Sequence, residues 1–340
     1  MRLLVTGGCG FMGSNFIRAM LQKYPDCSVC NLDALTYAGN PENLRDIEND
    51  PRYTFVHGRV EDEAVVEKVF SQFKPDCVLN YAAETHVDRS ILEPRAFLTT
   101  EIFGTHTLLE AVRRHETSRY IQISTDEVYG SIEEGLFTEL SPFDPSSPYS
   151  AAKAGADHLC QAYWKTFKTP VIVTHSCNFY GPYQYPEKMM PLFIINLLEG
   201  KKVPLYGDGL NVREWIYTED HCRAVDLLIH KGVLGESYNI GTGERMTNID
   251  LTHKILLLLG KGEEMIERVA DRAGHDRRYA VDSSKLNALG WQPQCSFEEA
   301  FAKTVEWYKT HEAWWKPLRS GEYLAYYKRQ YEERQPKDAN

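Results

Sequence analysis

Strand-like and helix-like segments alternate through the first half of the chain, which predicts an α/β fold with a doubly wound parallel sheet. Two observations support this prediction. Short apolar runs of strand length recur, and each is followed by apolar residues at helical spacing. A glycine-rich turn also joins the first strand-like run to the first helical pattern. In such a fold, ligands bind outside the carboxyl ends of the strands.

The predicted elements can be placed in order along the chain. Strands are expected at residues 3–6, 28–33, 54–58, 77–83, 120–124 and 171–178. Helices are expected up to residue 22 and near residues 62–73, 96–114 and 151–167. From about residue 179 the rhythm breaks into short irregular segments, which suits a second, smaller domain, while the segment near 215–231 is expected to return to the sheet.

Composition narrows the class of protein. Of 340 residues, 43% are apolar and 25% are charged, as in globular proteins that fold in water. The formal net charge of −10 argues against nucleic acid and anionic membranes as partners, because both attract basic surfaces. The longest apolar runs, such as 255–259, are too short to span a bilayer. Met1 leads directly into a strand-like run, so we expect no signal peptide and a cytoplasmic protein.

The eight cysteines are scattered along the chain. Cys27 and Cys30 are three residues apart in or beside a predicted strand, so their side chains point to opposite faces. No second pair or nearby histidine completes a metal site. We therefore expect reduced cysteines and no metal.

The glycine-rich turn has the form expected of a dinucleotide cradle. Gly7, Gly10 and Gly13 lie between the first strand and the first helix, where glycines let a pyrophosphate approach the backbone and the helix N-terminus attracts its charge. The predicted fold is therefore of the Rossmann type. Asp33 ends the second strand and can accept hydrogen bonds from a ribose. Since it would repel a 2′-phosphate, and no arginine occurs at 34–40, we favour NAD over NADP; the alternative is a solvated loop aspartate.

A tyrosine and a lysine, Tyr149 and Lys153, are spaced for one face of a helix. If that helix begins near Ser147 or Pro148, the two side chains lie one turn apart. A lysine ammonium and an oxidised nicotinamide would together lower the pKa of the phenol, so that Tyr149 could accept a proton from a sugar hydroxyl. The spacing alone also occurs by chance, and its weight comes from the rest of the chain.

These motifs together resemble the extended short-chain dehydrogenase/reductase superfamily, and within it the chain is most similar to the dTDP-glucose 4,6-dehydratase family. The similar runs are AETHVDRS at 83–90, STDEVYG at 124–130, GPYQYPEK at 181–188, GHDRRY at 274–279 and WWKPLRSGEY at 314–323. The resemblance spans nearly the whole chain, and its most discriminating element is Asp126 followed by Glu127. It implies a Rossmann-type NAD-binding domain at 1–178, with the returning segment near 215–231, and a mainly substrate-binding α/β domain at 179–340.

The resemblance also implies a reaction and a catalytic set. Tyr149, with Lys153 and Thr125, would deprotonate the sugar 4-hydroxyl while NAD accepts hydride from carbon-4. Glu127 would remove the carbon-5 proton, and Asp126 would protonate the departing 6-hydroxyl. The hydride would then return to carbon-6, which gives dTDP-4-keto-6-deoxy-glucose and regenerates NAD. Two neighbouring carboxyl groups of different pKa can divide the two proton roles.

The remaining site residues follow from the same resemblance. For the cofactor they are Gly7, Gly10, Phe11, Met12, Gly13, Asp33, Ala34, Leu35, Thr36, Arg59, Val60, Ala82, Ala83, Thr100, Tyr149 and Lys153. For the nucleotide-sugar they are Thr85, Thr125, Asn178, Lys188, Met189, Pro204, Leu205, Tyr206, Arg213, Asn248, Arg272 and His275.

The chain departs from the family pattern at three positions. Arg59 stands where the family usually has an aspartate near the adenine, and a guanidinium can only stack on the ring. Phe179 replaces an asparagine, and Ala273 replaces a proline. The helices near 96–114 and 151–167 resemble the family's dimer faces, so we expect a homodimer.

Other functions remain open from the sequence. A UDP-glucose 4,6-dehydratase differs in its substrate by one methyl group, a contact worth only about 1–3 kcal/mol. A nucleotide-sugar 4-epimerase would need the tyrosine and lysine but not the acidic pair. A non-catalytic NAD-sensing protein could share the fold, although it would not need all five catalytic residues.

Overall fold

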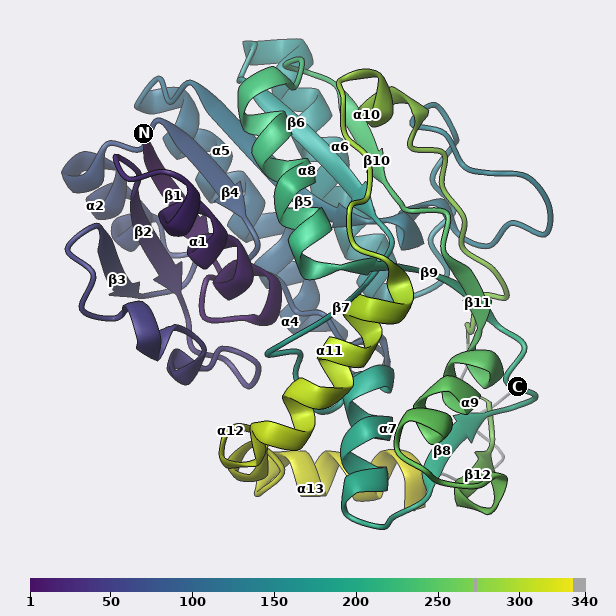
Figure 1. Cartoon of the computed structure of the whole chain (residues 1–340). Coiled ribbons are helices and arrows are strands. Elements are labelled where there is room, and N and C mark those ends of the chain that lie inside the picture. The colour runs from purple at the N-terminus through teal and green to yellow at the C-terminus, as the bar shows by residue number, and fades with distance from the viewer. Residues whose placement is uncertain (272–273, 333–340) are drawn as a thin grey trace.

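The computed structural model describes residues 1–271 and 274–332. Its centre is a seven-stranded sheet in the order β10-β6-β5-β4-β1-β2-β3, in which every neighbouring pair is parallel (Figure 1). This confirms the predicted doubly wound parallel sheet. The strands are β1 (Arg2–Thr6), β2 (Ser28–Asp33), β3 (Tyr53–His57), β4 (Cys77–Asn80), β5 (Arg119–Thr125), β6 (Val171–Ser176) and β10 (Ser237–Ile240).

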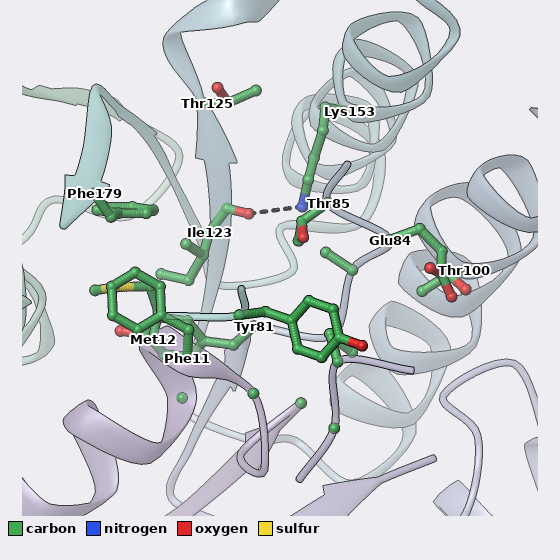
Figure 2. A pocket seen from close by; sticks show the side chains of 18 of the residues that line it. Phe11, Met12, Tyr81, Glu84, Thr85, Thr100, Ile123, Thr125, Lys153 and Phe179 are labelled. Atoms are coloured by element: carbon green, nitrogen blue, oxygen red, sulfur yellow. Dashed lines mark hydrogen bonds between the residues drawn. The ribbon is translucent and has the colours of Figure 1, made fainter. Parts of the chain in front are cut away.

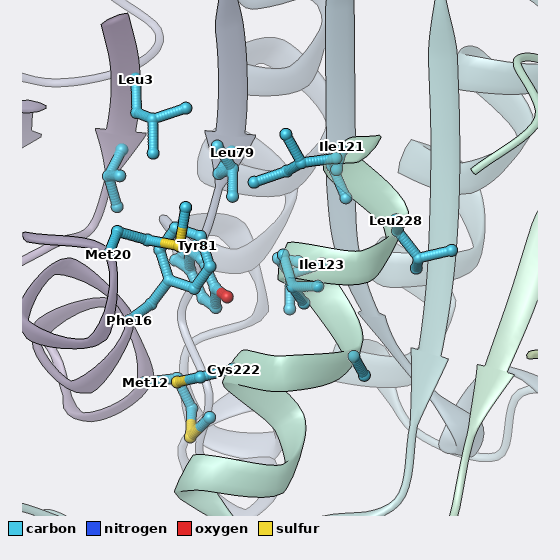
Figure 3. Close-up of a cluster of buried hydrophobic side chains, with 14 of the residues drawn as sticks. Leu3, Met12, Phe16, Met20, Leu79, Tyr81, Ile121, Ile123, Cys222 and Leu228 are labelled. Atoms are coloured by element: carbon cyan, nitrogen blue, oxygen red, sulfur yellow. The ribbon is translucent and has the colours of Figure 1, made fainter. Parts of the chain in front are cut away.

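Helices cover both faces of the sheet and bury its apolar side chains. On one face, α1 (Phe11–Lys23) and α8 (Thr218–Lys231) pack over the sheet. Figure 3 shows Phe16 and Met20 of α1 and Leu228 of α8 in one buried cluster with strand residues such as Leu79 and Ile121. On the other face lie α2 (Glu63–Phe73), α5 (Thr105–Arg114) and α6 (Pro148–Phe167). Burial on both faces explains why the strands read as continuous apolar runs in the sequence.

The long helix predicted at 96–114 contains a wider turn. It is built from α4 (Pro94–Leu98), a π-helical segment η2 (Thr99–Gly104) and α5, and a short helix α3 (Val87–Leu92) precedes it. Such wide turns often occur at functional sites. Here the wide turn carries Thr100 and the buried Glu101 toward the carboxyl end of the sheet.

The strand predicted at 171–178 is two strands in different sheets. β6 ends at Ser176, and Asn178 begins β7 (Asn178–Tyr180), which pairs with β9 (Val212–Tyr217). The chain therefore changes sheets at Cys177. A third strand, β11 (Arg245–Thr247), completes this small sheet, and β8 (Val203–Tyr206) pairs with β12 (Ile266–Val269) in another.

The C-terminal half forms a second core next to the small sheets, in the lower part of Figure 1. Its helices are α7 (Met189–Leu198), α9 (Asn248–Leu258), α11 (Phe297–Thr310), α12 (Glu312–Leu318) and α13 (Glu322–Tyr327). Because α8 and β10 instead join the main sheet, the two halves interleave. The remaining short elements are η1 (Pro41–Ile47), η3 (Asp126–Tyr129), η4 (Glu263–Met265), α10 (Ser284–Ala288) and η5 (Lys328–Glu332).

Candidate active site

One long cavity runs along the carboxyl ends of the central strands, and Figure 2 shows part of its wall. It is lined by all five residues predicted to be catalytic and by every residue predicted for the cofactor except Leu35. Four further residues predicted to bind the substrate also line the cavity: Thr85, Asn178, Lys188 and Met189. Residues far apart in the sequence therefore meet at the place where a parallel sheet binds its ligands.

The glycine turn forms a cradle that side chains would fill. Gly7 has a φ of +65°, and a Cβ atom there would lie 2.7 Å from the backbone nitrogen of Ala82. A Cβ atom on Gly13 would lie 2.4 Å from the carbonyl oxygen of Gly7. Gly10 is the N-cap of α1 and has no side chain to cap it. The helix N-terminus therefore faces the cavity with open backbone amides, which fits a pyrophosphate.

Asp33 holds this cradle in place at the end of β2. Its two carboxylate oxygens accept hydrogen bonds from the backbone amides of Cys9 at 2.8 Å and Leu35 at 2.7 Å. Burial raises the pKa of Asp33, and these two bonds act in the opposite direction. Leu35 lies in the left-handed region at φ 50° and packs on the core beneath the cavity instead of lining it. Ala34 and Thr36, on either side of it, do line the cavity.

The far end of the cavity carries the unusual Arg59. Its side chain is half exposed and its Nη1 donates to Oε1 of Glu61 at 3.1 Å. The neighbouring Val60 is buried against the helix that carries Thr100. Arg59 therefore has a carboxylate beside it, which supplies the acceptor that a guanidinium cannot.

Tyr149 and Lys153 lie one turn apart on α6, as the sequence predicts. A capping box between Ser147 and Ser150 starts the helix, with Pro148 as its first residue. Lys153 Nζ donates to the carbonyl oxygen of Ile123 at 3.1 Å (Figure 2) and lies 3.0 Å from Oε2 of Glu101. Lys153 thus has one hydrogen bond to the backbone and an ion-pair partner in Glu101, and its ammonium can also donate into the cavity.

In the protein alone, the pKa of Tyr149 is raised well above its usual value. Burial is the main cause, and the carboxylates of Glu127 and Glu101 add to it, while hydrogen bonding with Thr125 lowers it. The Glu101 carboxylate offsets the Lys153 ammonium. A cationic ligand in the cavity would act in the opposite direction and lower the pKa of Tyr149.

Thr125, Asp126 and Glu127 occupy the end of β5 and the start of η3. The Thr125 hydroxyl accepts from the Glu127 amide at 3.2 Å and donates to Oδ1 of Asp126 at 3.3 Å. Asp126 is 2% exposed, and its pKa is raised well above the usual value by burial, then by Glu127 and Glu214, against smaller effects of Arg213 and Thr125. Glu127 is only partly buried. The pair therefore consists of a buried carboxyl group that favours its protonated form and a more exposed neighbour.

Two of the predicted substrate residues are joined to each other. Lys188, the N-cap residue of α7, donates from Nζ to the carbonyl oxygen of Thr85. Met189 begins α7, and Asn178 begins β7. These four residues line the same cavity as the catalytic set.

The other predicted substrate residues do not line this cavity. Tyr206 and His275 face each other with ring centroids 6.0 Å apart, and His275 Nδ1 lies 2.5 Å from Oδ1 of Asp271. Arg213 lies 4.2 Å from the ring centroid of Tyr279 and donates to backbone carbonyls. The remaining members are Pro204, Leu205 and Asn248, in β8 and at the start of α9. Arg272 and Ala273 lie outside the described residues.

Several cavity residues were not predicted. Glu84 and Tyr185 lie in runs that carry the family resemblance, so proximity to those motifs could have identified them. Burial, followed by the charge of Glu101, raises the pKa of Glu84 to about 7. Glu101 had no sequence signal, because a glutamate in a helix is usually exposed. The other unpredicted residues with polar or aromatic side chains are Glu61, Tyr81, Ser124, Ser176, Phe179, Gln184 and Trp215.

Within residues 1–271 and 274–332, no group of three or more histidine, cysteine or acidic side chains is arranged to hold a metal ion. Among the same residues, no helix is long and apolar enough to cross a membrane. The eight cysteines are free thiols, and all but Cys295 are buried.

Comparison with known proteins agrees with this geometry. A family model described as GDP-mannose 4,6 dehydratase matches residues 4–304. The low-salt glycan biosynthesis protein Agl12 of Haloferax volcanii is 49% identical over 308 residues, covering 91% of this chain and 98% of that protein. The dTDP-glucose 4,6-dehydratase 1 of Escherichia coli K12 is 46% identical over 362 residues, which cover 98% of this chain and 100% of that protein. The structure of DesIV, a dTDP-glucose 4,6-dehydratase of Streptomyces venezuelae, was solved with NAD and TYD bound. It has a TM-score of 0.91 at 49% identity, and the match covers 94% of this chain and 100% of that chain.

Proposed function

The chain belongs to the GDP-mannose 4,6-dehydratase family, and on this premise we propose that it converts dTDP-glucose to dTDP-4-keto-6-deoxy-glucose and water. The protein is an NAD-dependent nucleotide-sugar dehydratase, an enzyme of the lyase class. The observation that carries the proposal is the pair formed by Asp126 and Glu127. A buried carboxyl group beside a more exposed one supplies an acid and a base at one place, which elimination of water requires and epimerisation does not.

The residues along the cavity fit NAD. Gly7, Gly10 and Gly13 would admit the pyrophosphate, and Asp33 would accept from the adenosine ribose. The Lys153 ammonium would donate to the nicotinamide ribose. When bound, NAD supplies the acceptor for the hydride of carbon-4 and returns that hydride to carbon-6.

The side chains of the site handle the protons. Tyr149 accepts the proton of the 4-hydroxyl, assisted by Thr125 and by the positive charge of Lys153. The resulting 4-ketone acidifies the carbon-5 proton, which Glu127 removes. Asp126, whose burial favours the protonated form, donates its proton to the departing 6-hydroxyl. Glu127 finally returns its proton to carbon-5, because the product has hydrogen there.

The substrate residues would bind the two ends of the nucleotide-sugar. We propose that Thr85, Thr125 and Asn178 contact the sugar. The residues proposed for the pyrophosphate end, where cations match phosphate charge, are Lys188, Arg213, Asn248, Arg272 and His275. Met189, Pro204, Leu205 and Tyr206 are proposed for the base. Tyr206 and His275 lie beside each other and do not line the cavity, so a nucleotide would extend from the cavity toward them.

Three further proposals concern the whole chain. We propose a cofactor domain of residues 1–178 with 215–231, to which β10 adds its strand, and a substrate domain formed mainly by 179–340. We propose a homodimer through the face that carries the half-exposed Leu98, Phe103 and Phe167. We also propose that the enzyme works in the cytoplasm, where its eight free thiols would stay reduced.

The direct test is to incubate the purified protein, without added cofactor, with dTDP-glucose and separately with UDP-glucose. The alkali-induced absorbance of a 4-keto-6-deoxy sugar reports product. We expect product from dTDP-glucose. Product from UDP-glucose alone would retain the mechanism and change the substrate. If neither sugar gives product, even after NAD is added, a nucleotide-sugar 4-epimerase or a non-catalytic NAD-sensing protein would replace this proposal.

A further inference from the structure

The proposed reaction leaves two side chains in the wrong protonation state after every turnover. Tyr149 starts as the base and ends protonated, because it has accepted the proton of the 4-hydroxyl. Asp126 starts protonated and ends as a carboxylate, because its proton has left with water. Glu127 and the hydride both return to their starting states. Before the next turnover, Tyr149 must therefore lose one proton and Asp126 must gain one.

We propose that the Thr125 hydroxyl is the relay that carries this proton from Tyr149 to Asp126. The inference rests on the proposed function, since it follows from the proton balance of that reaction. It gives Thr125 a task beyond contact with the substrate.

The hydrogen bonds of Thr125 are oriented for the second half of this transfer, the step to Asp126. Its Oγ1 accepts from the backbone amide of Glu127 at 3.2 Å, which leaves the hydroxyl proton to point at Oδ1 of Asp126 at 3.3 Å. A hydroxyl has a second lone pair, which can accept from Tyr149. Hydrogen bonding with Thr125 affects both neighbours, as it lowers the pKa of Tyr149 and the pKa of Asp126.

Burial favours an internal route over exchange with bulk water. The exposed fractions are 8% for Thr125, 8% for Tyr149 and 2% for Asp126. The direction of transfer depends on the bound cofactor. Burial raises the pKa of both Tyr149 and Asp126, and a cationic ligand beside Tyr149 would favour its phenolate and so drive the proton toward Asp126.

The transfer balances without any co-reactant. The O–H bond of Tyr149 breaks as a new O–H bond forms on Thr125 Oγ1. The original Thr125 O–H bond breaks as one forms on Oδ1 of Asp126. Thr125 ends neutral, one proton has moved, and no electrons are exchanged.

The test separates the first turnover from later ones by rapid quenching with excess dTDP-glucose. Thr125→Val keeps the shape of the side chain and removes the hydroxyl. Its first turnover slows, because Thr125 also contacts the sugar, but later turnovers should slow at least tenfold more. Product would then appear as a burst of one equivalent and a slow phase. A small buffer acid such as imidazolium, with its free base, should accelerate only the slow phase.

Two further variants serve as controls. Thr125→Ser keeps a hydroxyl and should remove the burst, whereas Thr125→Ala should behave like the valine variant and replaces it if that protein does not fold. Equal slowing of first and later turnovers, with no effect of buffer, would overturn the relay and leave a substrate contact only. An inactive wild-type protein would instead refute the proposed function.

Discussion

At the scale of single residues, the site depends on two carboxyl groups that are neighbours in sequence and differ in environment. Asp126 is enclosed at the end of β5, whereas Glu127 keeps partial access to solvent through the cavity. Burial disfavours the charged form of Asp126 and so raises its pKa, whereas Glu127 is less enclosed. Their substitution should therefore block different steps.

The first prediction concerns the carbon-5 proton. Glu127→Gln should abolish exchange of that proton with solvent and reduce dehydration about 10²–10⁴-fold, because a neutral amide cannot act as the base. Mass spectrometry of the nucleotide-sugar after incubation in D₂O measures the exchange. Asp126→Asn is the matched control, since it should block loss of water while exchange continues. Normal exchange in the Glu127 variant would remove Glu127 as the base.

The second prediction concerns Glu101, which is fully buried against Lys153. Its carboxylate contributes to the raised pKa of Tyr149, so Glu101→Gln should lower that pKa. Oxidation of the 4-hydroxyl fails as pH falls through the pKa of Tyr149, because the proton acceptor is lost. In a plot of the rate of this step against pH, the fall at low pH should therefore occur at lower pH in the variant than in the wild type. Loss of one partner from a buried ion pair should also cost about 3–5 kcal/mol of stability.

Stopped-flow absorbance of the reduced nicotinamide in a single turnover follows this step. Glu110→Gln is a suitable control, because Glu110 lies on the same helical run and pairs with Arg113 at the surface. A fall in rate that stays at the same pH, or moves to higher pH, would show that Glu101 does not act on Tyr149.

The contrast between these residues shows which parts of the site the sequence could predict. Asp126, Glu127, Tyr149 and Lys153 stand in compact motifs, so their types and spacing predict their chemistry. Glu101 lies 52 residues before Lys153 in the chain, and only the fold brings the two together. Electrostatics between such distant residues cannot be predicted from local patterns.

At the scale of elements, the wide turn of η2 explains why Glu101 was missed. Periodicity predicts a helix across 96–114 but not where one turn widens, because a π turn changes one hydrogen-bond spacing without a clear sequence signature. The start of α6 is the opposite case. Ser147 and Pro148 are typical of a helix N-terminus, so the helix could be predicted to within a residue.

The third prediction tests how that N-terminus supports Tyr149. Ser147→Ala removes the acceptor of the Ser150 amide, 3.1 Å away, and should cost about 1 kcal/mol. It should also reduce turnover several-fold, because Tyr149 lies in the first turn of the helix. Urea unfolding and steady-state rates measure the two effects.

A second N-cap serine provides the comparison. Ser296 begins α11, and its side chain makes no capping hydrogen bond. Ser296→Ala should therefore leave both stability and turnover close to those of the wild type. Equal losses in the two variants would mean that the capping box does not support the site.

At the scale of the whole molecule, the fold class was predictable and the arrangement was not. Alternating strands and helices predict a parallel sheet, because successive parallel strands need helical crossovers. The pairing of β10 with β6, and the change of sheets at Cys177, depend on contacts between distant segments. The same limit applies to the substrate residues around Tyr206, which come from separate elements of the second core.

The last prediction concerns association of whole molecules. Phe103, in the wide turn, is 61% exposed, and Leu98 and Phe167 lie about half exposed on α4 and α6, which pack with that turn and with each other. An exposed group of large apolar side chains is unfavourable in water, so we expect a second copy of the chain to cover it. Phe103→Asp would place a charge in that interface and should halve the mass measured by sedimentation equilibrium. Leu140→Asp is the control, because Leu140 is 94% exposed on a loop and should leave the mass unchanged. A wild-type mass of one chain, or a Phe103 variant that stays dimeric, would contradict this interface.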